Sequence, residues 1–225
     1  MVMQLTVEDH AKVSAAIAAA EAGTAGEIVA VATPSSDSYH DVALHWAVAA
    51  LVLVLAWAAW RPDQLGWWYD RFTLGWRADP TLGQLLTFLM LLAVLKFVVV
   101  LLLLRFQPLR LALTPGATKH RRVRRRAVSI FRAAAERRTV GRTGILIYLS
   151  MAEHRAEIVA DQAILDVTDD DVWGEAMAAL LADVRDGRPG DGLTAAIGRV
   201  GTVLAEHFPR HADDANEIPD KLIEL

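Results

Sequence analysis

The stretch RTGILIYLSMAEHRAEIVAD, residues 142–161, decides the fold. Its two runs, 144–150 and 154–160, are rich in β-branched and other apolar residues, and the short segment from Met151 to Glu153 separates them. Runs of this length and composition are typical of strands, and a tight connection between them predicts a β-hairpin.

Upstream, GEIVAVAT at 26–33 is a third buried strand, bounded by glycine and proline. Helical periodicity marks four further segments, at 5–23, 118–138, 170–187 and 190–208. Thr6 is a candidate N-cap for the first of them. The order of elements predicts that 26–33 pairs in parallel with 144–150 through a right-handed crossover. The fold class is therefore α/β, a small mixed sheet packed with helices.

Two long apolar runs interrupt that crossover, VALHWAVAALVLVLAWAAW from Val42 and QLLTFLMLLAVLKFVVVLLLLRF from Gln84. A bilayer core requires about 20 apolar residues, so both runs are candidate transmembrane spans. A hydrophobic content of 54% is in keeping with a membrane anchor. The predicted organisation is a first part of the α/β domain at 1–40, a transmembrane hairpin at 41–106 with spans at about 42–60 and 84–104, a second part of the domain at 107–210 and a tail at 211–225.

The distribution of basic residues predicts the orientation of this hairpin. The loop between the spans holds only Arg61, Arg71 and Arg77, whereas a dense basic stretch follows the second span. Because Lys and Arg near span ends favour the cytoplasmic side, both termini are expected in the cytoplasm. The sequence thus predicts a multi-pass protein of a bacterial inner (cytoplasmic) membrane.

The basic stretch at 118–138 is an amphipathic helix whose outer face carries Arg121, Arg122, Arg125 and Arg126. Anionic lipid headgroups are the expected ligand, and a positive flank that merely fixes topology is the alternative. Nucleic acid is not an expected partner, because the net charge is −4 and the hairpin tethers the helix to a membrane.

Lys96 lies inside the second apolar run. A charged residue at the centre of a membrane helix costs roughly 2.5 to 3.5 kcal/mol on insertion scales. One reading is a lysine that snorkels to the surface. The other is an intramembrane polar contact within a larger assembly, because helical side chains lean toward the N-terminus and thus away from the nearer surface here.

Enzymatic motifs are absent from the sequence: it has no Ser/His/Asp signature, no phosphate-binding loop and no His-Glu-x-x-His. The lack of cysteine excludes disulfides and cysteine-ligated metals. The best cofactor candidate is ADQAILDVTDDD, where Asp161, Asp166 and Asp169 could offer oxygen ligands to Ca²⁺ or Mg²⁺. Helix capping and a solvated acidic surface explain the same residues.

Three blocks of the chain, GTAGEIVAVAT, RTGILIYLSMAEHRAEIVADQAI and DGRPGDGLTAAIGRVGTVLAEHFP, resemble the TPM domain family. The resemblance implies a TPM-like sandwich, here interrupted by a transmembrane hairpin. Some members of that family resemble divalent-cation-dependent acid phosphatases, and others act in the assembly or maintenance of membrane complexes. Ala163 stands where members often have glycine, which departs from the pattern of a loop-based ion or phosphate site.

The function expected from residues and resemblance together is that of a membrane-anchored binding or accessory protein. It would serve the assembly, stabilisation or quality control of a membrane protein complex. A TPM-type acid phosphatase and a permanent structural subunit of such a complex are the alternatives.

Overall fold

The structure is a computed structural model of the 225-residue chain. It describes residues 5–73, 80–134, 143–168, 170–210 and 218–225. The chain divides into an α/β unit, formed by residues 1–37 and 116–225, and a hairpin unit, formed by residues 38–115. Each unit is described by itself.

The α/β unit is built on a four-stranded mixed sheet with strand order β3-β2-β1-β4. Its strands are β1 (Glu27–Thr33), β2 (Gly144–Ser150), β3 (Arg155–Ala160) and β4 (Ile223–Glu224). β1 and β2 are parallel and in register over their whole length, and β2 forms an antiparallel hairpin with β3. The predicted hairpin and the predicted parallel pairing are both confirmed.

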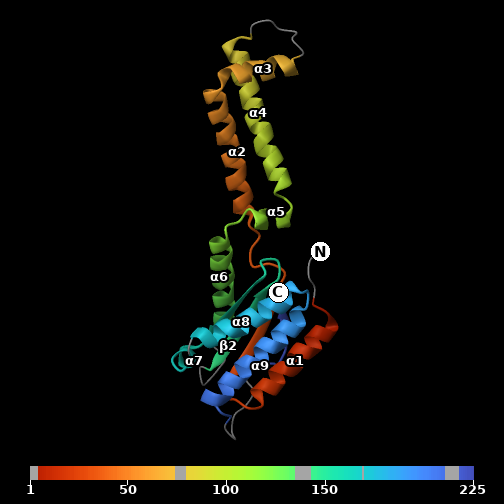
Figure 1. The fold of residues 1–225 in the computed structure, drawn as a ribbon, viewed down its shortest axis with the longest axis vertical. Coiled ribbons are helices and arrows are strands. Elements are labelled where there is room, and N and C mark those ends of the chain that lie inside the picture. Colours follow the sequence, from red (N-terminus) through yellow and green to blue (C-terminus); the bar gives the residue numbers. More distant parts are fainter. Residues whose placement is uncertain (1–4, 74–79, 135–142, 169, 211–217) are drawn as a thin grey trace. The chain divides into compact units, whose positions relative to one another are not determined.

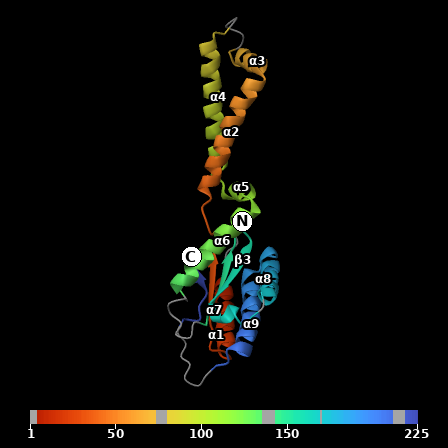
Figure 2. The ribbon, with the colours of Figure 1, turned by 90° about the vertical axis from the view of Figure 1, so that its left-hand side faces the viewer.

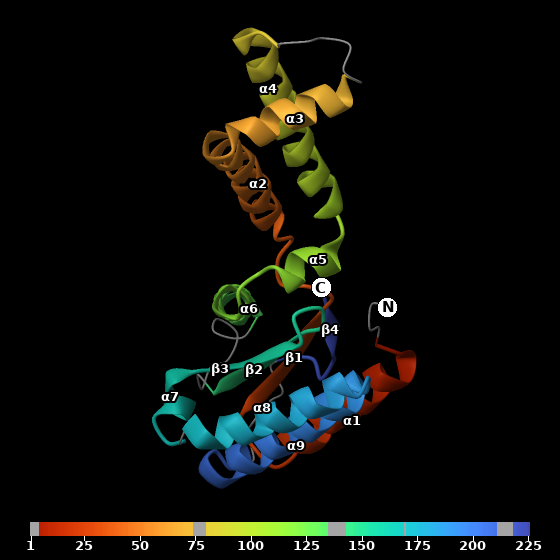
Figure 3. The same cartoon turned by 45° about the horizontal axis from the view of Figure 1, so that its top comes forward.

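Helices cover both faces of this sheet. On one face lie α1 (Val7–Glu21), α8 (Asp170–Arg185) and α9 (Pro189–His207), and on the other lies α6 (Gly116–Ala134), as Figure 3 shows. A short helix, α7 (Gln162–Leu165), follows β3. Figure 2 shows the same layers from the side, with β3 between α6 and α8. The predicted α/β class is confirmed as a sheet between two helical layers.

The alternation of side chains explains why the strands are apolar throughout. Ile28, Ile145 and Ile147 point into the core shared with α1, α8 and α9, whereas Val29 and Leu146 point into the core under α6. Successive strand residues face opposite sides of a sheet, so a sheet covered on both faces reads as a continuous hydrophobic run.

Two local features fix α1 in this unit. Thr6 and Asp9 form a reciprocal capping box at the start of α1, which confirms the predicted N-cap. Further along, α1 packs closely on α9, because a Cβ atom added at Gly201 would lie 2.5 Å from Ala20 Cβ. Only glycine permits that approach.

Within the predicted tail at 211–225, the described residues 218–225 contribute to the sheet instead. β4 pairs in parallel with β1 through Val31 and Ala32, and Ile218 and Leu222 are buried beside it. Residues 211–217 lie outside the described residues. β4 is therefore an edge strand of the sheet. It is defined by its pairing with β1 and not by a long apolar run.

The hairpin unit contains α2 (His40–Trp60), α3 (Pro62–Phe72), α4 (Leu82–Leu103) and α5 (Gln107–Ala112). α2 and α4 pack side by side (Figure 1) and match the predicted spans to within two residues at each end. By length and composition, both are long and apolar enough to cross a membrane. In the most apolar stretch of each helix, only 22% of the residues of α2 and 6% of those of α4 are buried. α3 and α5 are additional helices, and α3 lies in the segment expected as the loop between the spans.

Candidate functional site: the arginine face of α6 and its surroundings

The inner and outer faces of α6 differ sharply in chemistry. Val123, Ala127 and Phe131 are buried against the sheet, which confirms the predicted amphipathic helix. Arg121 and Arg125 are exposed on the other side. The spacing of the apolar residues at intervals of four thus turns these arginines outward.

Four arginines border one open depression of about 750 Å³ on α6. Its lining residues are Arg121, Arg124, Arg125, Val128, Ser129, Arg132 and Ala133. Among the described residues, no carboxylate lies within ion-pair distance of Arg121 or Arg125. The guanidinium groups of Arg121 and Arg125 are therefore available to an anion from outside the chain. Guanidinium groups bind phosphate and carboxylate groups through paired hydrogen bonds.

Glu157 of β3 holds one edge of this helix in place. His120 Nδ1 lies 3.0 Å from Glu157 Oε1, and Arg124 Nη1 lies 3.7 Å from Oε2. Burial raises the pKa of the Glu157 carboxyl, and the charges of His120, Arg124 and Arg155 oppose that rise. Arg124 therefore shares its charge between the depression and the sheet.

Arg122 differs from the other arginines predicted to bind lipid. Its Nη1 donates to Asp37 Oδ2 at 2.9 Å, and only 18% of its side chain is exposed. Arg121 and Arg125 line the depression, whereas Arg126 is exposed but does not border it. The structure thus brings two of the four predicted residues together and gives Arg122 an ion pair within the α/β unit.

A buried polar group, here termed the neck cluster, lies at the carboxyl ends of β1 and β2, next to the point where the hairpin unit is inserted. It consists of Ser35, Ser36, Tyr148, Ser150 and Glu153. Glu153 is 7% exposed. Its Oε1 accepts hydrogen bonds from the Ser35 hydroxyl at 3.2 Å and the Ser36 N–H at 3.0 Å, and its Oε2 accepts from the Ser150 hydroxyl at 2.5 Å.

Ser36 extends the neck cluster to the face of the sheet under α6. Its hydroxyl donates to Ser150 Oγ at 2.8 Å and shares a hydrogen bond of 2.9 Å with the Tyr148 hydroxyl. Burial raises the pKa of Tyr148, so this hydroxyl remains a hydrogen-bond donor at neutral pH. Ser150 is fully buried, whereas Ser35 and Ser36 are half-buried, and their hydrogen bonds to the neck cluster fix the chain before residue 38.

The predicted metal ligands fall into different environments. Asp161 is 8% exposed, and its Oδ2 accepts the Gly144 N–H at 2.9 Å, which ties the end of β3 to the start of β2. Asp166 is exposed and accepts a hydrogen bond of 2.7 Å from Gln162 Nε2. Asp169 lies outside the described residues, and within the described part no three His, Asp or Glu side chains form a metal-binding group. The Ca²⁺ or Mg²⁺ site stays a prediction.

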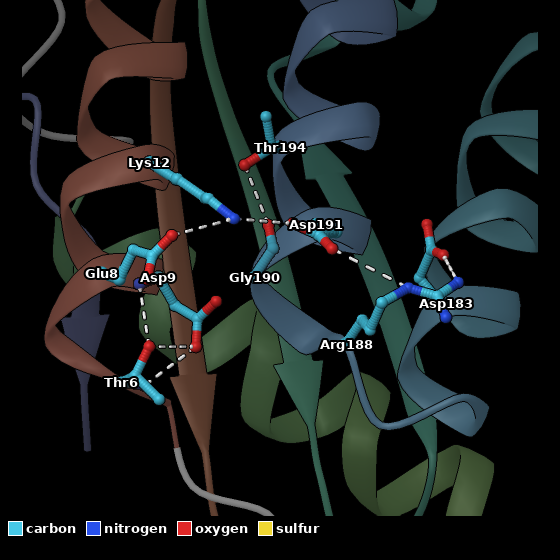
Figure 4. A network of polar contacts seen from close by, with 9 residues as sticks. All are labelled: Thr6, Glu8, Asp9, Lys12, Asp183, Arg188, Gly190, Asp191 and Thr194. Atoms are coloured by element: carbon cyan, nitrogen blue, oxygen red, sulfur yellow. Dashed lines mark hydrogen bonds and ion pairs between the residues drawn. The ribbon is translucent and has the colours of Figure 1, made fainter.

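The start of α9 carries a network of acidic and basic side chains from α1, α8 and α9 (Figure 4). Lys12 Nζ lies 3.3 Å from Asp191 Oδ1 and 3.5 Å from Glu8 Oε1. Arg188 donates to Asp183 Oδ1 at 2.6 Å and lies 3.8 Å from Asp191. Two cations of the chain itself therefore pair with the carboxylates at this helix start.

In the hairpin unit, Lys96 lies on the face of α4 that also carries Phe88 and Leu92. These residues border an apolar groove of about 470 Å³ with parts of α2 and α3. Trp57 and Trp68 lie on its other walls. The predicted intramembrane contact residue is thus exposed at the edge of a groove rather than isolated on a smooth helix surface.

A solved structure with a similar fold is the NMR structure of the BA42 protein from the psychrophilic bacterium Bizionia argentinensis. The likeness has a TM-score of 0.55 at 19% sequence identity and covers 98% of this chain and 95% of that chain. At this identity the likeness concerns the fold alone. No protein-family model matches the chain, and no curated protein matches it.

Proposed function

We propose that this chain is a membrane-anchored binding protein, an accessory factor in the assembly, stabilisation or quality control of a membrane protein complex. One observation carries the proposal: α2 and α4 leave most of their apolar side chains exposed. Soluble proteins rarely expose apolar surface on this scale, and a bilayer core covers it on helices of this length.

The proposed orientation follows from charge. The chain enters the hairpin unit after Asp37 and leaves it before Gly116, where α6 begins with its arginines. Two crossings return the chain to the side it left, and basic flanks favour the cytoplasmic side. Both termini are then cytoplasmic, and a bacterial inner membrane is the proposed location.

The arginines of α6 supply the second half of the proposal. Arg121 and Arg125 have no carboxylate partner among the described residues and line the same depression. Anionic headgroups suit such a surface, because each basic residue near a charged bilayer contributes about 1 kcal/mol. The α/β unit would then bind the membrane surface through α6 as well as through the hairpin.

The resemblance to the TPM family gives the proposal its functional class. Its three blocks fall on β1, on the β2–β3 hairpin and on α9, which pack together in one core. Because no group of three His, Asp or Glu side chains that could hold a metal ion is assembled among the described residues, we propose the binding role found in that family rather than phosphatase chemistry.

The test replaces residues 42–104 with an unrelated two-span hairpin and leaves the α/β unit unchanged. We expect the native chain, purified from its own membranes in mild detergent, to bring a membrane protein complex with it, and the chimera to lose that complex. The matched control is the native hairpin with Arg121 and Arg125 changed to Gln, which should retain it. Equal recovery with the chimera would assign recognition to the α/β unit alone.

A further inference from the structure

The groove beside Lys96 is formed by three helices of the hairpin unit. Leu53 and Trp57 of α2 face Phe88 and Leu92 of α4 across it, and Trp68 of α3 borders one end. Its volume of about 470 Å³ is within the range of ligand pockets. Apart from Lys96, the lining residues carry no charge.

Contacts among aromatic rings fix the walls of this groove. Tyr69 packs edge-on against Phe88 at 5.6 Å, and Phe72 lies 5.9 Å from Phe88 and 5.8 Å from Trp68. Trp57 Nε1 donates to Gln64 Oε1 at 3.1 Å, which joins the end of α2 to α3. The groove therefore exists before any ligand arrives, which lowers the cost of binding.

The depth of Lys96 in α4 limits what can reach its ammonium group. From Lys96 the helix continues to Leu103, about 10 Å further at 1.5 Å per residue, and it begins at Leu82, about 21 Å earlier. A helical side chain leans toward the N-terminus, so Lys96 leans away from the nearer end. A lipid phosphate lies outside the hydrocarbon core, whereas an acidic side chain on a neighbouring helix can lie at the same depth.

We propose that this groove binds a transmembrane helix of another protein, and that an Asp or Glu of that helix pairs with Lys96. A second copy of this chain does not supply that acid from its spans, because α4 holds no Asp or Glu and the one acidic residue of α2, Asp41, lies in its first turn. The inference rests on the proposed membrane anchoring and specifies the chemistry of the partner.

A chain without cysteine permits a direct test. The full-length protein with Leu92→Cys is reconstituted in phosphatidylcholine vesicles with a synthetic Leu/Ala transmembrane peptide. That peptide carries one cysteine and, one turn away, either Asp or Leu at the depth of Lys96. The control is Val94→Cys, because Val94 is exposed two residues further along α4 and thus faces nearly the opposite way.

We expect disulfide formation between Leu92→Cys and the Asp peptide to exceed that with the Leu peptide by about five- to thirtyfold, the range given by polar contacts between membrane helices. Val94→Cys should show no such preference. Lys96→Met should remove the preference, and Lys96→Arg should preserve it.

Three outcomes overturn the inference. Equal cross-linking of the Asp and Leu peptides would show that the partner helix needs no acidic residue. Equal cross-linking at Leu92→Cys and Val94→Cys would show that the peptide does not bind in the groove. Loss of the Asp preference when phosphatidylglycerol replaces part of the phosphatidylcholine assigns the groove to an anionic lipid. Resistance of the reconstituted protein to alkaline extraction is measured in the same samples, so a failure of anchoring is distinguished from a failure of helix recognition.

Discussion

The two units of this chain use apolar residues in opposite ways. In the α/β unit, β1 and β2 are buried on both faces, between α6 and the layer of α1, α8 and α9. In the hairpin unit, α2 and α4 contact each other along one side and expose the rest of their apolar surface. The α/β unit buries its apolar residues within itself, whereas the hairpin unit needs something outside it to cover its apolar residues. Hydrophobic content alone does not distinguish the two units. They differ in whether the apolar side chains pack against other elements of the same unit or stay exposed.

The largest effect expected from this contrast concerns solubility. The full-length chain should stay with membranes under alkaline extraction. A variant in which a short Gly/Ser linker joins Asp37 to Gly116 should be soluble and folded, because the ion pair of Asp37 with Arg122 lies within the α/β unit. Sedimentation and circular dichroism measure both properties. A soluble full-length chain would contradict the proposed membrane anchoring.

The next effect compares one leucine from each unit. Leu149 is fully buried, whereas Leu91 is 59% exposed. Leu149→Ala should lower the unfolding free energy of the α/β unit by about 2–5 kcal/mol, and Leu91→Ala should leave it nearly unchanged. Hydrogen exchange of the β2 amides in the full-length protein measures both. Equal effects would mean that the two units unfold as one.

Charge on the outer face of α6 gives a smaller effect. In the soluble variant, Arg121→Gln with Arg125→Gln should weaken binding to phosphatidylglycerol vesicles by about 2 kcal/mol, or about thirtyfold. The matched control changes Arg185 and Arg199, which lie on α8 and α9 across the sheet. Vesicle sedimentation measures the affinity. If both pairs weaken binding alike, net charge rather than the arginine face attracts the protein.

The last effect concerns the pH dependence of stability. Burial raises the pKa of Glu21 to about 8 from 4.5, with the charges of Glu27 and Asp220 adding to the rise and a hydrogen bond from the Ile28 N–H opposing it. Between these values the folded state holds a proton that the unfolded state releases, so this contribution is complete below pH 4.5 and lost as pH rises through 8.

Glu21→Gln should therefore flatten the decline in stability between pH 5 and pH 8, because Gln cannot release that proton. Denaturant titrations of the soluble variant at several pH values measure the slope, with Glu8→Gln, which changes an exposed glutamate of the same helix, as control. An unchanged slope would place the proton on another carboxyl group.

Much of the fold could be predicted because its signals are local. The strands are continuous apolar runs between turn residues. The two candidate spans are longer than any helix described in the α/β unit. α3 was missed, although Pro62 at its start and Asp63 in its first turn are signals of a helix beginning. β4 could not be predicted, because two residues carry no period and pairing with β1 alone defines them.

The site was predicted less completely, because its geometry depends on residues far apart in sequence. The run of arginines is visible, but the pairing of Arg122 with Asp37 is set by the fold. In the neck cluster, Ser36 pairs with Glu153, and the two residues lie on either side of the hairpin unit in the sequence. Polar residues directly after two adjacent parallel strands are the signal that could have indicated it.

The parallel pairing of β1 with β2 also sets an order of events during synthesis. Both neighbours of β1 in the sheet, β2 and β4, lie after the hairpin unit in the chain. The ribosome therefore produces β1 first, and this apolar strand has no partner until α2 and α4 have been made. An unpaired apolar strand in a nascent chain is prone to aggregate, so chaperones that bind residues 27–33 while the hairpin unit is being synthesised should govern the yield of folded protein.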